Sequence, residues 1–261
     1  MKRKWGQHFL FSSQIARRIV EAADLKNDDS VLEIGPGHGE LTRYYADHVS
    51  EAVAIEIDPK FSAALSRRWG STGRFRVITQ DIRDLDFAAL GMRRDPVVLG
   101  NLPYYVSKPT IRRLLDWGRF SRAIVTVQRE LAVRLLAKPG DSEYSLFSVY
   151  FLLRAEGELL FNVEPSAFRP EPEVVSSVIR LRIRSSSRPN PPLLERLLRV
   201  SFASRRQKLL NNLKRGFKEF NSVRIARAME SAGIFLDARA QELAPEQFLV
   251  LAATLEEADV I

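Results

Sequence analysis

Four consecutive residues, Asn101-Leu102-Pro103-Tyr104, place an amide, two backbone carbonyls and an aromatic ring after a predicted buried strand, residues 96–100. An exocyclic amine on an aromatic base gains from hydrogen-bond acceptors as its nitrogen becomes tetrahedral, and amide and carbonyl oxygens are such acceptors. Pro103 fixes φ and so keeps the turn in shape. The ring of Tyr104 offers a face for an extruded base. The segment predicts a site for the amine of a base; the alternative is an ordinary strand-ending turn with a packed tyrosine.

A glycine loop, Gly35-Pro36-Gly37-His38-Gly39, follows another predicted strand, residues 30–34. Glycines without Cβ atoms let a ligand approach the backbone closely. A dinucleotide fingerprint needs a further glycine at its sixth position, where this chain has Glu40, and this favours S-adenosylmethionine over a pyrophosphate ligand. Taken alone, the loop is weak evidence, and the alternative is a tight strand-to-helix turn that binds nothing.

Two acidic residues strengthen the cofactor prediction. Glu56 ends the next predicted strand, residues 52–57, at 21 residues after Gly35, where a carboxylate can accept both hydroxyls of a ribose. Asp81 follows a third predicted strand, residues 75–79, and can accept a hydrogen bond from the amino group of the cofactor's adenine. S-adenosylmethionine carries an activated methyl group, so positioning and electrostatics suffice for its transfer to an adenine amine.

Strands and helices alternate along the first two thirds of the chain, which predicts a parallel, doubly wound sheet. Two later β-type segments, residues 158–163 and 174–183, have no helix between them and are expected to pair antiparallel at one sheet edge. This α/β pattern predicts a Rossmann-like class I methyltransferase sheet. The helices that we expect to cover it are residues 13–24, 41–49, 60–69, 108–117 and 129–137.

A polar, proline-rich break at residues 185–192 indicates a domain boundary, and only helical patterns follow it. We therefore predict a methyltransferase domain at residues 1–187 and a small all-α domain at residues 188–261. The formal net charge is +8, and residues 196–227 hold ten Lys or Arg against one acid, Glu219. This concentration indicates an RNA-contacting surface, although a basic run can also be a solvated helix face.

Composition excludes several classes of site and partner. The chain has no cysteine, and its three histidines, His8, His38 and His48, are scattered, so we expect no metal. No apolar stretch approaches the roughly 20 residues that span a membrane. The first residues lack a secretory or organelle-targeting pattern, which indicates a cytoplasmic protein. Nothing in the sequence indicates an obligate interface, so a monomer is expected.

With these residues in view, the chain from Gly6 to Phe248 resembles the ribosomal RNA adenine N6,N6-dimethyltransferases, and most closely the bacterial small-subunit type. The opening Gly6-Gln7-His8-Phe9-Leu10 is similar to the family segment that lies over the cofactor, with His8 in place of the commoner asparagine. Residues 31–39 match the cofactor loop, and residues 101–104 match the catalytic motif. Residues 165–174 are similar to a late loop of the family, and Tyr144 to Ser148 departs from the family pattern.

The resemblance implies further site residues. It places Phe168 against the target adenine, whereas the residues alone favour a buried core position for this side chain. It adds His8, Leu10, Ile57 and Ile82 to the expected cofactor contacts, with His8 donating a hydrogen bond to the cofactor's carboxylate. The expected RNA contacts belong to a basic helical segment and are Arg205, Arg206 and Lys208.

The resemblance also implies a reaction: two methyl groups on each of two adjacent adenosines near the 3′ end of small-subunit ribosomal RNA, during subunit maturation. Three alternatives stay open. One is methylation of large-subunit ribosomal RNA, as in antibiotic-resistance relatives with the same catalytic residues. Another is an RNA-binding assembly or transcription factor without turnover, and the third is a nicotinamide dehydrogenase, which Glu40 disfavours.

Overall fold

The computed structural model describes residues 8–184 and 191–257. These residues form two compact units, each with its own core. The sheet unit consists of residues 8–132 and 155–183, and the helical unit consists of residues 133–154, 184 and 191–257. None of the described helices is long and apolar enough to cross a membrane.

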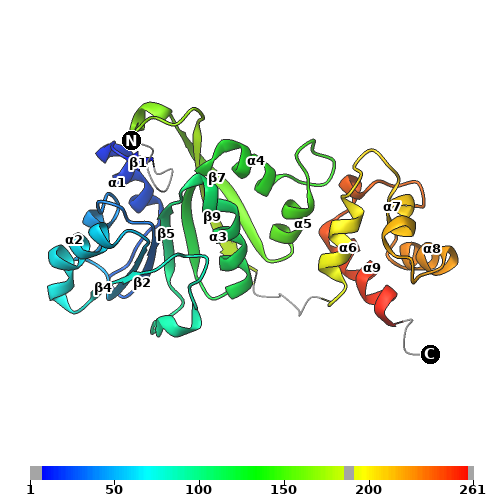
Figure 1. Cartoon of the computed structure of the whole chain (residues 1–261), viewed down its shortest axis with the longest axis horizontal. Coiled ribbons are helices and arrows are strands. Elements are labelled where there is room, and N and C mark those ends of the chain that lie inside the picture. The colour runs from blue at the N-terminus through cyan, green and yellow to red at the C-terminus, as the bar shows by residue number, and fades with distance from the viewer. Residues whose placement is uncertain (1–7, 185–190, 258–261) are drawn as a thin grey trace. The chain divides into compact units, whose positions relative to one another are not determined.

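The described residues of the sheet unit form a seven-stranded sheet in the order β4-β3-β2-β5-β6-β9-β7 (Figure 1). Strands β2 to β6 are parallel to one another, and β9 runs antiparallel between β6 and β7, as the sequence predicts. A separate antiparallel pair joins β1 to β8. The strands are β1 (Phe9–Leu10), β2 (Ser30–Ile34), β3 (Glu51–Glu56), β4 (Phe75–Thr79), β5 (Val97–Asn101), β6 (Arg122–Gln128), β7 (Ala155–Val163), β8 (Phe168–Arg169) and β9 (Ser176–Ile183).

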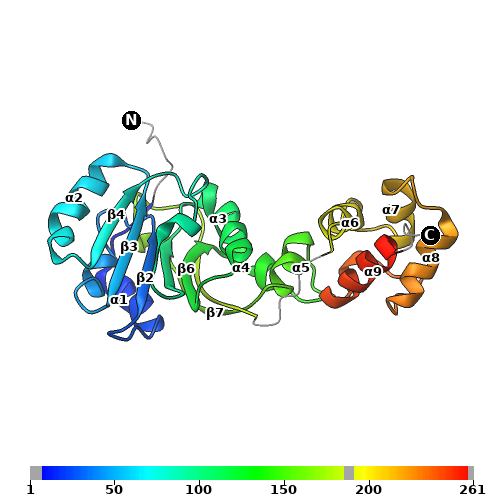
Figure 2. The ribbon, with the colours of Figure 1, turned by 90° about the horizontal axis from the view of Figure 1, so that it is seen from below.

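Helices cover both faces of this sheet, with α1 and α2 on one face and α3 on the other (Figures 1 and 2). The central strands are buried on both faces, which explains their continuous apolar runs. The helices of this unit are α1 (Ser13–Ala22), α2 (Pro59–Trp69) and α3 (Tyr104–Trp117), and α4 (Arg129–Leu136) begins in it.

Residues 41–49 are not the α-helix that the sequence predicts. They form a 3₁₀ turn at Thr42–Tyr44 followed by further turns. The side chains of Thr42 and Tyr45 both donate hydrogen bonds to Glu33 on the neighbouring strand, and these bonds hold the segment in a tighter path.

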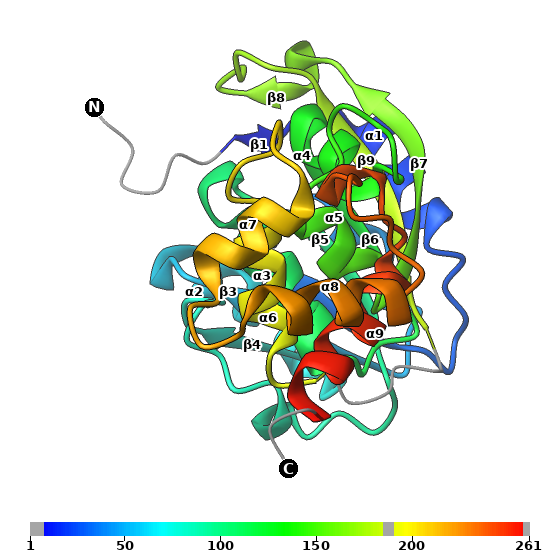
Figure 3. The ribbon, with the colours of Figure 1, turned by 90° about the vertical axis from the view of Figure 1, so that its right-hand side faces the viewer.

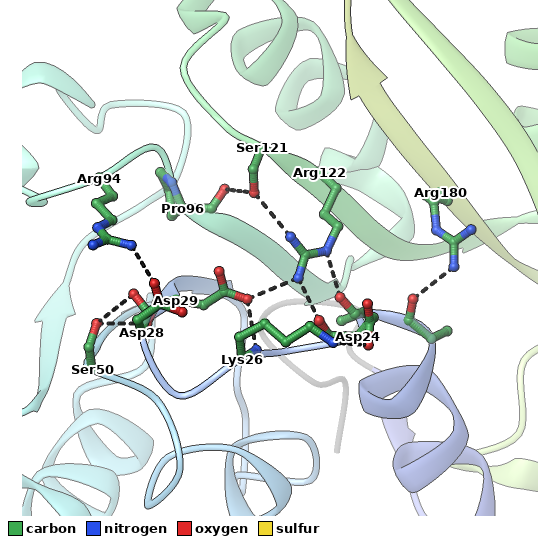
Figure 4. Close-up of polar contacts among 12 residues, drawn as sticks. Asp24, Lys26, Asp28, Asp29, Ser50, Arg94, Pro96, Ser121, Arg122 and Arg180 are labelled. Carbon is green, nitrogen blue, oxygen red and sulfur yellow. Dashed lines mark hydrogen bonds and ion pairs between the residues drawn. The ribbon is translucent and has the colours of Figure 1, made fainter.

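At the edge of the sheet where the parallel strands begin, arginine side chains bond to the end of α1 and to the residues that follow it (Figure 4). Arg122 donates to the carbonyls of Ala23 and Asp24 and to the carboxylate of Asp29, and Arg180 donates to the carbonyl of Ala22. Cations at these positions satisfy the last carbonyls of α1 and suit the negative end of the helix dipole.

The helical unit packs around a core that includes Leu197, Leu213, Phe217 and Phe248. Its helices are α5 (Leu146–Leu152), α6 (Leu194–Ser201), α7 (Leu209–Gly216), α8 (Ser222–Ser231) and α9 (Pro245–Glu257) (Figure 3). Residues 133–154 belong to this unit, although the sequence places them in the methyltransferase domain. The predicted boundary at residues 187 and 188 lies outside the described residues.

Candidate active site

A small cavity of about 30 Å³ lies where β2 and β5 end, at the carboxyl edge of the sheet. Open α/β sheets bind ligands at this edge. The cavity is lined by Asn101 and Pro103 of the predicted catalytic segment. It is also lined by four of the residues predicted to bind the cofactor: His8, Leu10, Gly35 and Gly37. The structure therefore joins the N-terminal segment, the glycine loop and the catalytic segment at one site.

The glycine loop needs its glycines for two different reasons. Gly37 has φ +58°, and its N–H donates to the Glu56 carboxylate at 3.0 Å. A Cβ at Gly37 would lie 3.0 Å from the ring of Phe9, which covers the loop. Gly39, with φ +83°, is buried against α2, where a Cβ would meet the Trp69 ring at 2.7 Å. Gly37 thus serves the site, whereas Gly39 serves helix packing.

Glu56 is 1% exposed and partly engaged by the chain itself. Its oxygens accept hydrogen bonds from the N–H groups of Gly37 and Asp58, at 3.0 and 2.9 Å. Burial raises the pKa of this carboxyl, while the bonds from backbone N–H groups oppose the rise. Each carboxylate oxygen has two acceptor positions, but Glu56 is buried and does not line the cavity, so the ribose contact expected for it stays a prediction.

Two other carboxyl groups, Glu33 and Glu40, line the cavity, whereas Glu56 does not. Burial raises the pKa of Glu33 to about 7, against the lowering effect of hydrogen bonds from Thr42 and Tyr45, both at 2.6 Å. The charges of Glu40 and Glu56 raise it further, and burial also raises the pKa of Glu40. A cavity with these acids favours a cationic ligand and disfavours a phosphate.

The structure does not bring Asp81 to the lining of this cavity. Its carboxylate pairs with the guanidinium of Arg83 at 2.6 Å, and this hydrogen bond holds the pKa of Asp81 below its usual range. Ile57 follows β3 half-buried, Ile82 is buried beside Asp81, and neither lines the cavity. The contacts of these three residues with the cofactor's nucleoside stay predictions.

Asn101 is the last residue of β5, and its amide is held by the N-terminal segment. Its Nδ2 donates to the backbone carbonyl of His8 at 3.0 Å, an arrangement assigned from the hydrogen-bond network. With Nδ2 engaged, Oδ1 is the amide atom left to accept a hydrogen bond from a substrate amine.

The two candidate backbone carbonyls differ in what they already accept. The Pro103 carbonyl receives the N–H of Val106 at 3.0 Å and the hydroxyl of Ser107 at 2.9 Å. The Leu102 carbonyl receives only a longer contact, 3.3 Å, from the same hydroxyl. A carbonyl has two acceptor positions, so Leu102 is the better second acceptor for an amine.

The ring of Tyr104 is half-buried at the start of α3, and burial raises the pKa of its hydroxyl. The hydroxyl bonds to that of Ser176 at 2.8 Å, which fixes the ring. The imidazole of His8 stacks on this ring, with centroids 5.3 Å apart and planes 27° apart. Its Nδ1 lies 2.8 Å from the carbonyl oxygen of Pro170. In this structure the face expected for a base is therefore covered by His8.

Phe168 does not face the site. It is 1% exposed in β8, paired with Leu10 of β1 and packed into the core of the sheet unit. The core position that the residues alone favour is the observed one, because the pairing of β1 with β8 turns this ring inward. A role against the target adenine is not supported by this arrangement.

The predicted RNA contacts lie in the helical unit. Arg205, Arg206 and Lys208 are all exposed, but they occupy the loop between α6 and α7 rather than a helix. The departure at residues 144–148 has structural roles. Tyr144 is buried and donates to the carbonyl of Leu243, while the residues around Ser145 form the capping box that starts α5.

Comparison with known proteins decides the family. The family model for "Ribosomal RNA adenine dimethylase" matches residues 1–257. The chain belongs to this family. Curated relatives named "Ribosomal RNA small subunit methyltransferase A" occur in Acidobacterium capsulatum, at 38% identity over 98% of this chain and 92% of the relative, and in Myxococcus xanthus, at 34% over 97% and 90%.

Solved structures of similar proteins extend over both units of this ribosomal RNA adenine dimethylase family member. A dimethyladenosine transferase from Plasmodium falciparum matches with a TM-score of 0.82 and 28% identity, covering 97% of this chain and 98% of that one. The 23S rRNA methyltransferase ErmE matches with a TM-score of 0.71 and 26% identity, covering 95% and 99%. The predicted class I methyltransferase fold is confirmed.

Sequence reasoning missed Glu33 as a cavity residue of this dimethylase. The available signal was a single acid inside the apolar run Val31-Leu32-Glu33-Ile34, where a charged side chain is costly unless it has partners. It missed Ser107 as well, because a serine one turn into a helix gives no sign of which carbonyl its hydroxyl will contact.

Proposed function

We propose that this chain transfers methyl groups from S-adenosylmethionine to N6 of two adjacent adenosines near the 3′ end of small-subunit (16S) ribosomal RNA, giving N6,N6-dimethyladenosine. The observation that carries the proposal is the orientation of Asn101. Its Nδ2 is engaged by the carbonyl of His8, so its Oδ1 is the acceptor in a cavity that two carboxyl groups, Glu33 and Glu40, also line.

The residues that line the cavity suit the chemistry of the cofactor, although the cavity must widen to admit it. S-adenosylmethionine brings a methyl group on a positively charged sulfur, together with an ammonium group. Glu33 and Glu40 make the cavity attractive to cations, and Gly35 and Gly37 let backbone approach the ligand. Glu56, with acceptor positions to spare, is assigned to the ribose, and Asp81 to the adenine amino group.

The chain's contribution to the transfer is positioning. We assign the Oδ1 of Asn101 and the carbonyl of Leu102 as acceptors for the two amine hydrogens, so that the nitrogen becomes tetrahedral and its lone pair is withdrawn from the π system of the base. Tyr104, fixed by Ser176, is assigned as the stacking face. The base replaces the imidazole of His8 on that face. Each transfer forms the N–CH3 bond, breaks the S–CH3 bond and releases one amine proton; the methylated amine keeps one hydrogen, so one of the two acceptors serves the second transfer.

The assignment to small-subunit RNA rests on the relatives named for that activity, and large-subunit RNA is the competing substrate because ErmE shares the fold. The experiment is to incubate the protein and isotope-labelled S-adenosylmethionine separately with unmethylated small and large ribosomal subunits, and to map the label by mass spectrometry. Dimethyladenosine at a neighbouring pair in small-subunit RNA is expected. Label confined to large-subunit RNA would overturn the substrate assignment.

A matched pair of variants tests the catalytic assignment in the same assay. Asn101→Ala removes the amide acceptor and is expected to abolish labelling. Asn211→Ala changes an exposed amide on α7 and is expected to label as the unaltered protein does. Equal labelling by Asn101→Ala would contradict the mechanism, whereas labelling of neither subunit by the unaltered protein would favour an assembly factor without turnover.

A further inference from the structure

The most exposed large apolar side chain of the helical unit is that of Phe235, at 81%. It follows the end of α8, where Gly233 has φ +65° and the N–H of Ile234 donates to the Met229 carbonyl at 2.9 Å. This is the hydrogen bond of a Schellman ending, which a left-handed glycine permits. It sends Ile234 into the core, at 3% exposure, and leaves the next residue, Phe235, in water.

The turn that carries Phe235 is fastened to the basic loop between α6 and α7. The N–H of Ala238 donates to the Phe235 carbonyl at 3.0 Å, and the carbonyl of Ala238 accepts the N–H of Leu209 at 2.8 Å. Arg239 then donates through Nε to the carbonyl of Arg206 at 3.3 Å. The turn that holds Phe235 is therefore joined to residues 206–209 by two backbone hydrogen bonds and one bond from the Arg239 side chain, none of which involves the ring of Phe235.

The cations of this basic loop are not neutralised within the described residues. The side chains of Arg206 and Lys208 are exposed and have no hydrogen bond or ion pair there. The guanidinium of Arg205 contacts a neutral group, the carbonyl of Ser142, at 2.5 Å. The turn also contains one acidic residue, Asp237. The Oε1 of Glu242 lies 3.8 Å from the Nη1 of Arg239. The local balance is positive, which favours a polyanion.

We infer that Phe235 is a base-stacking residue in an RNA-binding surface of the helical unit, formed by Phe235, Arg206 and Lys208. An exposed aromatic ring beside unpaired cations matches the needs of single-stranded RNA: the ring stacks on an unpaired base, and the cations contact its phosphates. The inference rests on the proposed function for the source of that RNA. It adds a sequence-tolerant contact made outside the sheet unit that holds the catalytic segment.

The test measures binding of the full-length protein to unmethylated small ribosomal subunits and to protein-free transcribed small-subunit RNA, across a salt series. Phe235→Ala is expected to weaken binding to both by about 5- to 150-fold, as for the loss of one stacked base, without changing the salt slope. Phe235→Trp is expected to restore binding. Lys208→Ala is expected to weaken binding and to lower the salt slope by about one.

Val223→Ala is the matched control, because Val223 is 60% exposed on α8 and has no part in the proposed surface. Thermal melting checks that each variant is folded. Unchanged RNA binding by Phe235→Ala would overturn the inference. It would not affect the proposed function, which is tested separately by methylation with the unaltered protein. Weakened binding to assembled subunits alone, with free RNA unaffected, would overturn it in favour of a ribosomal protein.

If the unaltered protein methylates large subunits instead, the proposed substrate fails and the same binding series is run with large-subunit RNA. A loss with Phe235→Ala there would support the stacking role independently of the substrate, and no loss would refute it.

Discussion

The replacement of Glu33 by glutamine tests the electrostatics of the cavity through the pH dependence of folding. Glu33 is 1% exposed on β2, and burial raises its pKa from 4.5 to about 7. Each pKa unit corresponds to about 1.4 kcal/mol, so keeping Glu33 ionised in the folded protein costs on the order of 3 kcal/mol. Glutamine keeps an oxygen for the hydroxyls of Thr42 and Tyr45 but cannot ionise.

The direction in which stability changes with pH follows from proton uptake by Glu33. Between pH 4.5 and about 7 the folded protein binds more protons at Glu33 than the unfolded chain, so stability from this group falls as pH rises through that window. Below the window both states are protonated, and above it both are ionised. The difference in free energy of unfolding, Glu33→Gln minus unaltered protein, should therefore increase by about 3 kcal/mol from pH 4.5 to pH 8.

Urea unfolding measures this difference, followed by tryptophan fluorescence, since Trp69 and Trp117 lie in the sheet unit that holds Glu33. Other titrating groups are common to the two proteins and cancel in the difference. If the free energies of unfolding of the two proteins change in parallel between pH 4.5 and 8, Glu33 has the same pKa in the folded and unfolded states. A difference that decreases as pH rises would show that the hydrogen bonds from Thr42 and Tyr45 outweigh burial.

Three further predictions concern the same unit. Lowering the pH from 8 to 6 should weaken S-adenosylmethionine binding in calorimetry, because protonated Glu33 no longer attracts a cation. The pH dependence of binding should be smaller in Glu33→Gln. An undiminished pH dependence in that variant would assign the effect to another titrating group. Tyr104→Ala should lower kcat/KM for RNA by about 5- to 150-fold through lost stacking, whereas Tyr104→Phe should keep most activity; equal losses would point to the hydroxyl bonded to Ser176. Gly39→Ala should destabilise the fold by about 1 to 3 kcal/mol in urea unfolding, more than Gly91→Ala, which shares a positive φ but meets nothing within 4 Å; equal effects would leave backbone strain as the whole cause.

The sheet was predictable because its signals are local. Strand β2 is a short apolar run closed by Gly35, and its neighbours repeat that form, so their order and their shared carboxyl edge follow from the rules for parallel sheets. The same rules place Asn101 beside the glycine loop. Nothing in them places His8, because a segment of two paired residues, Phe9–Leu10, gives no periodic signal.

The parts of the structure that differ from the local sequence pattern depend on distant partners. Residues 41–49 have helical periodicity, but two hydroxyls in them bond to Glu33, which a local pattern does not reveal. Phe168 turns inward because β8 pairs with β1, more than 150 residues earlier in the chain. Residues 133–154 read as a continuation of the sheet domain, yet Tyr144 is buried with the C-terminal helices, and only the folded chain shows that contact.

The N-terminal segment links the two halves of the site. Through its backbone, His8 holds the amide of Asn101, and through its ring it covers Tyr104. Phe9, the next residue, lies against Gly37, whose N–H bonds to Glu56. The adjacent residues His8 and Phe9 thus contact the catalytic segment and the glycine loop, so a backbone displacement of these two residues would act on both. Rotation of the His8 side chain alone would instead uncover Tyr104 while the bond from Asn101 to the His8 carbonyl and the contact of Phe9 with Gly37 stay in place.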